Sequence, residues 1–261
     1  MVYIFMGKNR KNRLTKFREP NNIIPVAFTA IEQDIYALIL CELSKESWAS
    51  KHKDTTINFV DNLIEFSITE LKDYFDCSLS NLSKNVRSAS NSLCVKEINI
   101  TLDDGNNKNI KLLDSCEFHI NSGLHIEVNK EAKELIFKFI SNNYSEIDLN
   151  LYLNLKSKHS KRLLKFISQW KMTKFKTNEI KMSKYRKSFS IDENKYLRTE
   201  AFIRKCIDEP IKEILNKSDN QWILKDEKGY LLKKEGRKIG SIVFTVFFNK
   251  KDEDADNNDN D

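Results

Sequence analysis

Apolar residues recur at steps of three and four positions along the segment 195–219, near the C-terminal end of the chain. This spacing places them on one face of a helix, with most basic residues off that stripe. The apolar positions are Phe202, Ile203, Cys206, Ile207, Ile211, Ile214 and Leu215. Pro210 cannot donate a backbone hydrogen bond, so we expect a kink or a new helix start there.

Two strand-like runs follow this helix, at 221–226 and 241–248, with the polar connection 228–240 between them. The connection is basic, and Lys233, Lys234, Arg237 and Lys238 lie close together in its second part. A basic helix followed by a basic two-stranded ribbon suits the grooves and phosphates of duplex DNA. We therefore interpret 195–248 as the recognition helix and wing of a winged-helix module.

The first half of the chain has a similar order of elements. Thr29 and Glu32 have the spacing of a capping box, which predicts a helix to about residue 45. The further predicted elements are a strand at 64–68, a helix from the cap Thr69 to Phe75, a helix from Ser80 to Leu93, and strands at 98–102, 110–113, 117–120 and 124–128. An Asp-Gly turn joins the first two of these four strands, and we expect all four in one sheet. Helix, strand, helix, helix, hairpin is the order of a winged helix.

Two short segments suggest that one fold unit occurs twice. Residues 66–75 read FSITELKDYF and residues 180–189 read IKMSKYRKSF, with apolar residues matching at the first, third and sixth positions. Tyr185 matches Leu71, so this tyrosine is either a phosphate contact, like its basic neighbours, or part of the core. Acidic positions in the first copy become Lys184 and Lys187 in the second. The repeat predicts an α+β fold of two tandem winged-helix domains related by a pseudo-repeat.

The expected organisation has four parts. They are a basic N-terminal arm at 1–24, a first winged-helix domain at 25–141, a second at 142–250, and a disordered acidic tail at 251–261. Helices at 130–141 and 149–170, the latter broken near Ser157, join the two halves. The first domain is expected to dimerise or contact the DNA backbone, and the second to recognise DNA.

Charge separates the two halves. Residues 151–250 hold 25 Lys or Arg against 11 Asp or Glu, a net charge of +14, whereas residues 21–150 have a net charge of −8. This asymmetry indicates a polyanionic partner for the second half. A solvated lysine-rich surface is the alternative on charge alone.

The sequence carries no signature of catalysis or of a bound metal. Its six glycines are isolated, and no phosphate-binding loop or paired Cys/His motif is present. His119 and His125 are expected to be ordinary sheet residues, and the five scattered cysteines to be reduced thiols. Apolar segments are too short to cross a bilayer. We therefore expect a soluble cytoplasmic protein, not an enzyme, with no cofactor and no metal.

Candidate DNA contacts follow from position in the two predicted domains. Residues early in a recognition helix usually reach base edges, whereas the preceding helix and the wing hold the backbone. We expect base contacts from Arg198, Thr199, Arg204 and Lys205, phosphate contacts from Lys184, Arg186 and Lys187, wing contacts from Arg237 and Lys238, and weaker contacts from Ser80, Asn81, Ser83, Lys84 and Arg87 in the first half.

Three segments of the second half carry a family resemblance. They are LNLKSKHSKRLLKFI at 153–167, FIRKCIDEPIKEILNKSD at 202–219 and EGRKIGSIVFTV at 235–246, with looser likeness at 23–43 and 64–93. They resemble the plasmid replication initiators that carry two winged-helix domains and bind repeated origin sequences, called iterons. The resemblance implies that the partner is double-stranded iteron DNA and that the protein helps to open the origin and recruits host replication proteins. It also implies that the protein forms a homodimer and that the monomer is the active form.

Two other classes of function remain open on the sequence. A winged-helix transcriptional regulator would read an operator with the same helix and have no role in replication. An enzyme such as a nickase or recombinase is the third class, although a strand-cutting initiator needs a His-x-His metal pair that this sequence lacks. No pattern in the sequence identifies the target bases or the oligomer that binds them.

Overall fold

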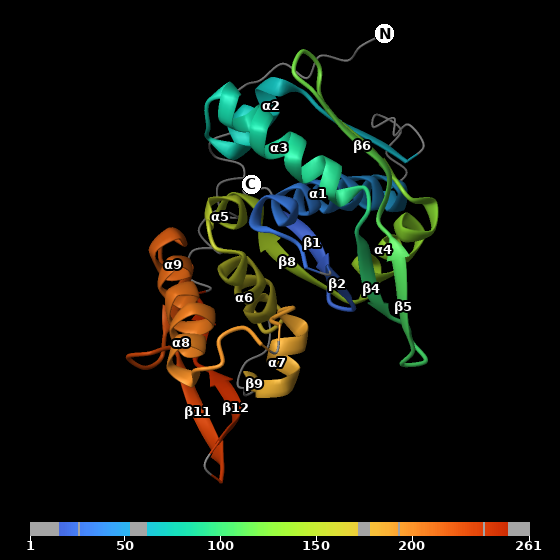
Figure 1. Ribbon diagram of the computed structural model, residues 1–261. Helices are drawn as coiled ribbons and strands as arrows, with labels where there is room; N and C mark the ends of the chain where they lie inside the picture. The colour runs from blue at the N-terminus through green and yellow to red at the C-terminus, as the bar shows by residue number, and fades with distance from the viewer. Residues whose placement is uncertain are drawn as a thin grey trace, which may run out of the picture.

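The computed structural model describes residues 16–25, 27–52, 62–171, 178–192, 194–236 and 238–249. Two mixed α/β units lie side by side, with helix α6 between them (Figure 1). The first unit and its connection comprise β1 (Lys16–Pro20), β2 (Ile23–Pro25), α1 (Ala30–His52), β3 (Leu63–Phe66), α2 (Ile68–Phe75), α3 (Leu79–Leu93), β4 (Glu97–Thr101), β5 (Asn107–Lys111), β6 (Leu113–His119), β7 (Gly123–Val128), α4 (Lys130–Asn142), β8 (Tyr144–Asp148), α5 (Leu149–Asn154) and α6 (Lys158–Ser168). The second comprises β9 (Asn178–Lys181), α7 (Met182–Ser188), α8 (Thr199–Ile203), the π-helix η2 (Arg204–Asp208), α9 (Glu209–Lys217), β10 (Trp222–Leu224), β11 (Tyr230–Glu235), β12 (Lys238–Phe244) and β13 (Val246–Phe248).

The same supersecondary unit occurs in both halves. A strand is followed by two helical segments and a hairpin, and the last hairpin strand pairs with the first strand of the unit. The strand orders are β3-β7-β6 and β9-β12-β11, with antiparallel pairing throughout. Leu71 in α2 and Tyr185 in α7 occupy matching positions, and both are fully buried. The predicted α+β fold of two winged-helix domains related by a pseudo-repeat is confirmed. The predicted disorder of 251–261 falls outside the described residues.

Two predicted helix features are confirmed. The backbone amide of Thr29 donates to the Glu32 carboxylate at 2.6 Å, and the Glu32 amide donates to the Thr29 hydroxyl at 3.3 Å. Helix α1 extends to His52, beyond the expected end near residue 45. The break near Ser157 separates α5 from α6, and the Ser157 hydroxyl accepts from the amide of His159 at 3.1 Å.

Two predicted helix starts lie slightly too late in the chain. Ser67, not Thr69, caps α2, because Ser67 and Glu70 form a reciprocal capping box. Helix α3 begins at Leu79, one residue before the expected start at Ser80, and Ser78 is its cap. In each case the true cap is the earlier of two hydroxyl residues, which leaves the later one inside the first turn.

The strands of the first half form two sheets where one was expected. Strands β4 and β5 pair with each other but continue to β2, whereas β6 and β7 pair with β3. The wing also differs from the prediction, because its first strand, β11, lies within residues 228–240, which were expected to connect two strands. Strand β11 buries only Tyr230 and so lacks the alternation by which a strand is recognised. The expected strand at 221–226 instead pairs as β10 with β13.

The N-terminal segment belongs to the first unit. Strand β1 pairs along its length with β8, so the chain just beyond residue 141 is tied to the first half. Phe17 in β1 is fully buried and packs edge-on against Tyr152, with ring centroids 5.4 Å apart. Within the expected arm at 1–24, residues 16–20 lie in β1 and residues 23–24 lie in β2. Residues 1–15 of that arm lie outside the described range, and the expected domain limits stay a prediction.

Pro210 lies within a helical run that continues from Thr199 to Lys217. The amide of Glu209 donates to the carbonyl of Arg204 five residues earlier, which defines the π-helix η2. Residues at both junctions keep right-handed helical backbone angles. The irregularity expected at Pro210 is present, as a π segment followed by α9 with the proline in its first turn.

Candidate nucleic-acid interface

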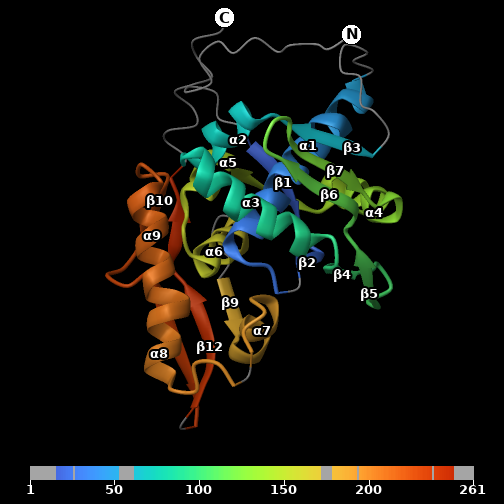
Figure 2. The ribbon, with the colours of Figure 1, turned by 45° about the horizontal axis from the view of Figure 1, so that its top comes forward.

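The run α8–η2–α9 buries one side and exposes basic residues on the other. Phe202, Cys206 and Ile207 are almost completely buried, while the helix runs along the outer side of the second unit (Figure 2). The four residues predicted to contact bases are all exposed: Arg198, Thr199, Arg204 and Lys205. Lys205 forms an ion pair with Glu209 at 2.8 Å, one turn further along. The structure therefore presents all four predicted side chains to solvent.

Arg186 organises the loop that enters the recognition helix. Its guanidinium donates to the backbone carbonyls of Asp192, Lys195 and Tyr196 at 3.1–3.4 Å. The same group lies 4.5 Å from the centre of the Phe202 ring, a cation–π contact. Arg186 was expected to hold a phosphate, but its donors are directed at the protein's own carbonyls. Its neighbours on α7, Lys184 and Lys187, are exposed as expected.

Tyr185 joins the first helix of the unit to the second. Its hydroxyl donates to the Cys206 carbonyl at 2.6 Å. In an α-helix this carbonyl would accept from the amide four residues later, but that residue is Pro210, which has none. The Tyr185 ring also stacks on Phe189 with centroids 3.9 Å apart, and burial holds its pKa well above the usual value. Of the two interpretations of Tyr185, the core one is confirmed.

The wing is a hairpin of exposed basic residues. Glu235 pairs with Lys238, and Gly236 between them has a φ of +63°, a conformation that glycine adopts without strain. Lys238 is exposed, whereas the predicted contact Arg237 lies outside the described residues. Lys233 forms an ion pair with Glu179 on β9 at 2.5 Å. The wing therefore offers Lys238 to a ligand.

Helix α3 is the equivalent element of the first unit and is less basic. Leu82 and Val86 are buried against the core. The predicted contacts Ser80, Asn81, Lys84 and Arg87 are exposed, and Ser83 is half-buried. The Ser80 hydroxyl lies 3.1 Å from that of the cap Ser78. This helix presents two cations, Lys84 and Arg87, to solvent.

Helix α6 ties the recognition helix to the rest of the protein. Glu213 on α9 accepts hydrogen bonds from the amides of Lys156 and Ser157 at 2.5 and 3.3 Å, and from the Ser160 hydroxyl at 2.5 Å. Unpaired amides at a helix N-terminus favour a carboxylate. The role of Glu213 has no signal in the sequence, because its partners are 53 to 57 residues away in the chain.

The other side of α6 carries a buried ion pair with the first unit. Lys161, fully buried, lies with its Nζ 2.5 Å from a carboxylate oxygen of Asp34 on α1, and also donates to the Tyr152 carbonyl. Burial raises the pKa of Asp34 to about 7 and lowers that of Lys161. Lys161 lies three residues before Leu164, on the apolar face of the helix. A lysine on the apolar face of a predicted helix is the sequence feature from which a buried ion pair could have been predicted.

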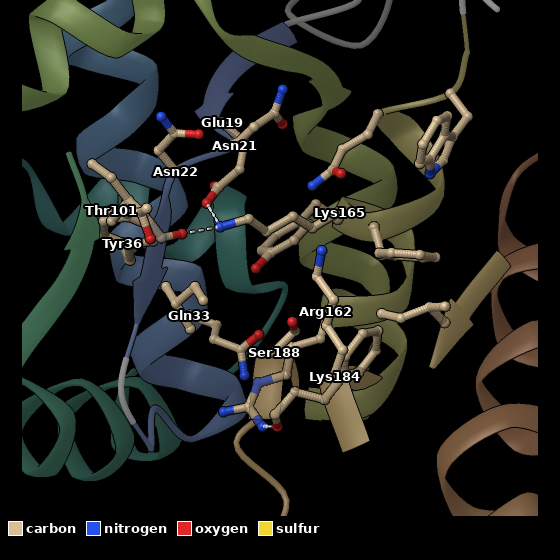
Figure 3. A pocket seen from close by; sticks show the side chains of 18 of the residues that line it. Glu19, Asn21, Asn22, Gln33, Tyr36, Thr101, Arg162, Lys165, Lys184 and Ser188 are labelled. Carbon is tan, nitrogen blue, oxygen red and sulfur yellow. Dashed lines mark hydrogen bonds and ion pairs between the residues drawn. The ribbon is translucent and has the colours of Figure 1, made fainter. Parts of the chain in front are cut away.

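A cavity of about 610 Å³ lies between the two units beside α6. Figure 3 shows Lys165 directed from α6 towards Glu19, with which it forms an ion pair. Arg162, next to it, donates to the carbonyls of Phe28 and Phe189, one in each unit. Charged groups of α6 thus bond to both units beside the cavity, Lys165 to the first and Arg162 to both.

The described residues contain no group of three or more His, Cys, Asp or Glu side chains able to hold a metal ion. His119 and His125 lie on the solvent side of β6 and β7, where they pair with Glu117 and Glu65. Within the same described part of the chain, no helix is both long and apolar enough to span a membrane.

The fold and the exposed basic helix define a tandem winged-helix protein of the DNA-binding class. Comparison with known families makes this specific. Residues 16–168 match the family model described as initiator replication protein, WH1, and residues 181–246 match that of the initiator Rep protein, WH2. The chain belongs to this family of replication initiators, as the resemblance implied.

Among solved structures, the chain is similar to the Pi initiator protein, whose crystal structure is in complex with iteron DNA. The TM-score is 0.64 at 16% sequence identity, over 92% of this chain and 100% of the other. This likeness supports the fold of both units together. No curated protein sequence matches the chain.

Proposed function

We propose that this protein initiates plasmid replication by binding iterons, the direct repeats of an origin, as double-stranded DNA. The family match and the iteron complex of the similar Pi protein support this proposal. The observation that carries it is the uninterrupted helix from Thr199 to Lys217, which exposes Arg198 and Arg204 near its start. A rigid helix that presents basic side chains at its N-terminal end suits the major groove.

The two domains have different roles in this proposal. The second, with a net charge of +14 over 151–250, reads the repeat, with arginine directed to guanine and Thr199 to a thymine methyl group. Lys184, Lys187 and Lys238 contact phosphates. The first domain contacts the backbone through α3, pairs with another copy, or does both.

Further properties follow from the same proposal. The protein works in the cytoplasm without catalysing a covalent reaction, forms homodimers, and binds origin DNA as a monomer. It helps to open the origin and recruits host replication proteins. The acidic balance of 21–150, a net charge of −8, suits a surface that contacts proteins more than DNA.

Footprinting of the DNA that flanks the gene tests the proposed function. We expect protection of tandem direct repeats next to an AT-rich tract. A single protected palindrome, with no repeats, would instead indicate a transcriptional regulator. Incubation with supercoiled DNA and a divalent metal ion provides the second test, since a nicked product would show an enzyme.

Salt dependence gives an independent check on the same complex. If about eight phosphates are neutralised, log affinity falls with log salt at a slope of about −7. A slope near zero would contradict a basic interface of this size.

A further inference from the structure

An exposed leucine precedes the recognition helix of the second domain. Leu197, between Tyr196 and Arg198, is 77% exposed. A ligand group that covered such a side chain would remove apolar surface from water, which is favourable. Its position beside exposed Arg198 and Thr199 places it among the predicted base contacts.

The loop that carries Leu197 is held in one conformation. Arg186 binds the carbonyls of Lys195 and Tyr196, the two residues immediately before it. The Tyr196 ring packs edge-on against His159 of α6, with centroids 5.9 Å apart. A backbone that is already held loses little further freedom on binding, so the loop is preorganised to present Leu197.

The first domain also has an accessible leucine near the start of its second helix. Leu79 is the first residue of α3, directly after the cap Ser78, and is 40% exposed. Leu197 instead comes directly before Arg198, the cap of α8, so the two leucines occupy different positions relative to the helix start. The inference therefore concerns Leu197 alone.

We infer that Leu197 is a specificity-determining residue that packs against the 5-methyl group of a thymine in the major groove. This inference rests on the proposed function and names one base contact within it. Thymine is the base that offers an apolar group in that groove, and aliphatic side chains contact it. Leu197 thereby selects thymine over cytosine at one position of the repeat, beside the positions read by arginine.

Replacement of thymine by uracil removes only the methyl group and gives a direct test. Each thymine of the footprinted repeat is changed in turn to uracil, and affinity is measured for the wild type, Leu197→Ala and Val95→Ala. Val95 is a matched control because it is 80% exposed but lies in the turn after α3. The affinity of the wild type should fall about fourfold when one particular thymine is replaced, the value expected for one buried methyl-sized group.

The inference requires that Leu197→Ala bind the natural repeat more weakly than the wild type does. Uracil at that same thymine should not lower the affinity of the variant further, and uracil at every other thymine should change its affinity as it does for the wild type. Val95→Ala should behave as the wild type. A wild-type profile in Leu197→Ala, or a wild type indifferent to every uracil, would overturn the inference while leaving iteron binding intact. A wild type that does not prefer the repeat to scrambled DNA would contradict the proposed function itself and this inference with it.

Discussion

The hydroxyl of Tyr185 donates a 2.6 Å hydrogen bond to the backbone carbonyl of Cys206, across the two helices of the second winged-helix unit. Pro210 leaves this carbonyl without the donor that a regular α-helix would supply, and Cys206 itself lies in the π segment η2. The hydroxyl therefore supplies the missing bond and fixes α7 against the recognition helix. Both Tyr185 and Cys206 are fully buried, so water cannot replace it.

Tyr185→Phe should lower the free energy of unfolding by about 1–3 kcal/mol, because it leaves a buried acceptor unpaired. In a Pro210→Ala background, residue 210 regains an amide, so the same change should cost less by about 1 kcal/mol. Urea unfolding of the four proteins measures this coupling. Tyr196→Phe is the control, since that hydroxyl makes only a 3.5 Å contact with His159. Equal costs in both backgrounds would show that Tyr185 does not compensate for Pro210.

Arg186→Ala and Lys187→Ala should weaken DNA binding by different mechanisms. Arg186 holds the loop before the helix, so its loss should lower both Tm and affinity, the latter about tenfold, with an unchanged salt slope. Lys187 is exposed, and its loss should make the slope less steep by about 1 without changing Tm. Affinity measured over a salt series separates the two. A reduced salt slope with a normal Tm in Arg186→Ala would show instead that Arg186 contacts a phosphate, as its sequence position predicts.

Glu213→Gln should destabilise the protein by about 1–2 kcal/mol, because a carboxylate at the start of α6 binds two amides and a hydroxyl. Glu209→Gln is a matched control on the same helix, where only an exposed pair with Lys205 is lost. That change should cost less than about 0.5 kcal/mol. Denaturant midpoints of the two variants decide the matter, and similar values would argue against Glu213 as an anchor between α6 and α9.

Lys161→Met should be increasingly destabilising as pH rises. The folded-state pKa of Asp34 is raised from 3.8 to about 7, so its contribution to stability is largest at low pH and is lost as pH rises towards 7. Without Lys161 that pKa rises further, and the loss continues above pH 7. Above pH 7, the difference in unfolding free energy between the wild type and Lys161→Met should widen by up to about 1.4 kcal/mol per pH unit.

Unfolding curves at pH 6, 7 and 8 measure the gap for Lys161→Met. A double variant with Asp34→Leu as well should lose the pH dependence, because no carboxylate remains to be ionised. A gap that stayed constant from pH 6 to 8 would contradict a raised pKa at Asp34.

Much of this fold follows from local patterns in the sequence. The capping box at Thr29, the break at Ser157 and the matched positions Leu71 and Tyr185 all depend on residues within one helix turn or one short repeat. The wing strand β11 escaped prediction because it is an exposed edge strand with a single buried residue. Such strands are specified by pairing with a neighbour, which periodicity does not report.

The candidate interface was predictable in part for a related reason. Exposure of Arg198 and Arg204 follows from the helical period, since the buried residues occupy the opposite face. The role of Arg186 does not, because its partners are backbone carbonyls of a loop whose path no side-chain pattern fixes. Glu213 and Lys161 contact elements far away in the chain, so their contacts depend on how α6 docks rather than on spacing along the sequence.

The central claim is that the helix starting at Thr199 reads base sequence. Affinities of the wild type and Arg198→Ala for all single-base variants of the repeat test it most directly. The account predicts that Arg198→Ala loses about 1–3 kcal/mol of discrimination at one base pair and keeps its selectivity at the others. Uniform weakening across every variant would contradict it, because the side chain would then contact phosphate and the helix would not read that base.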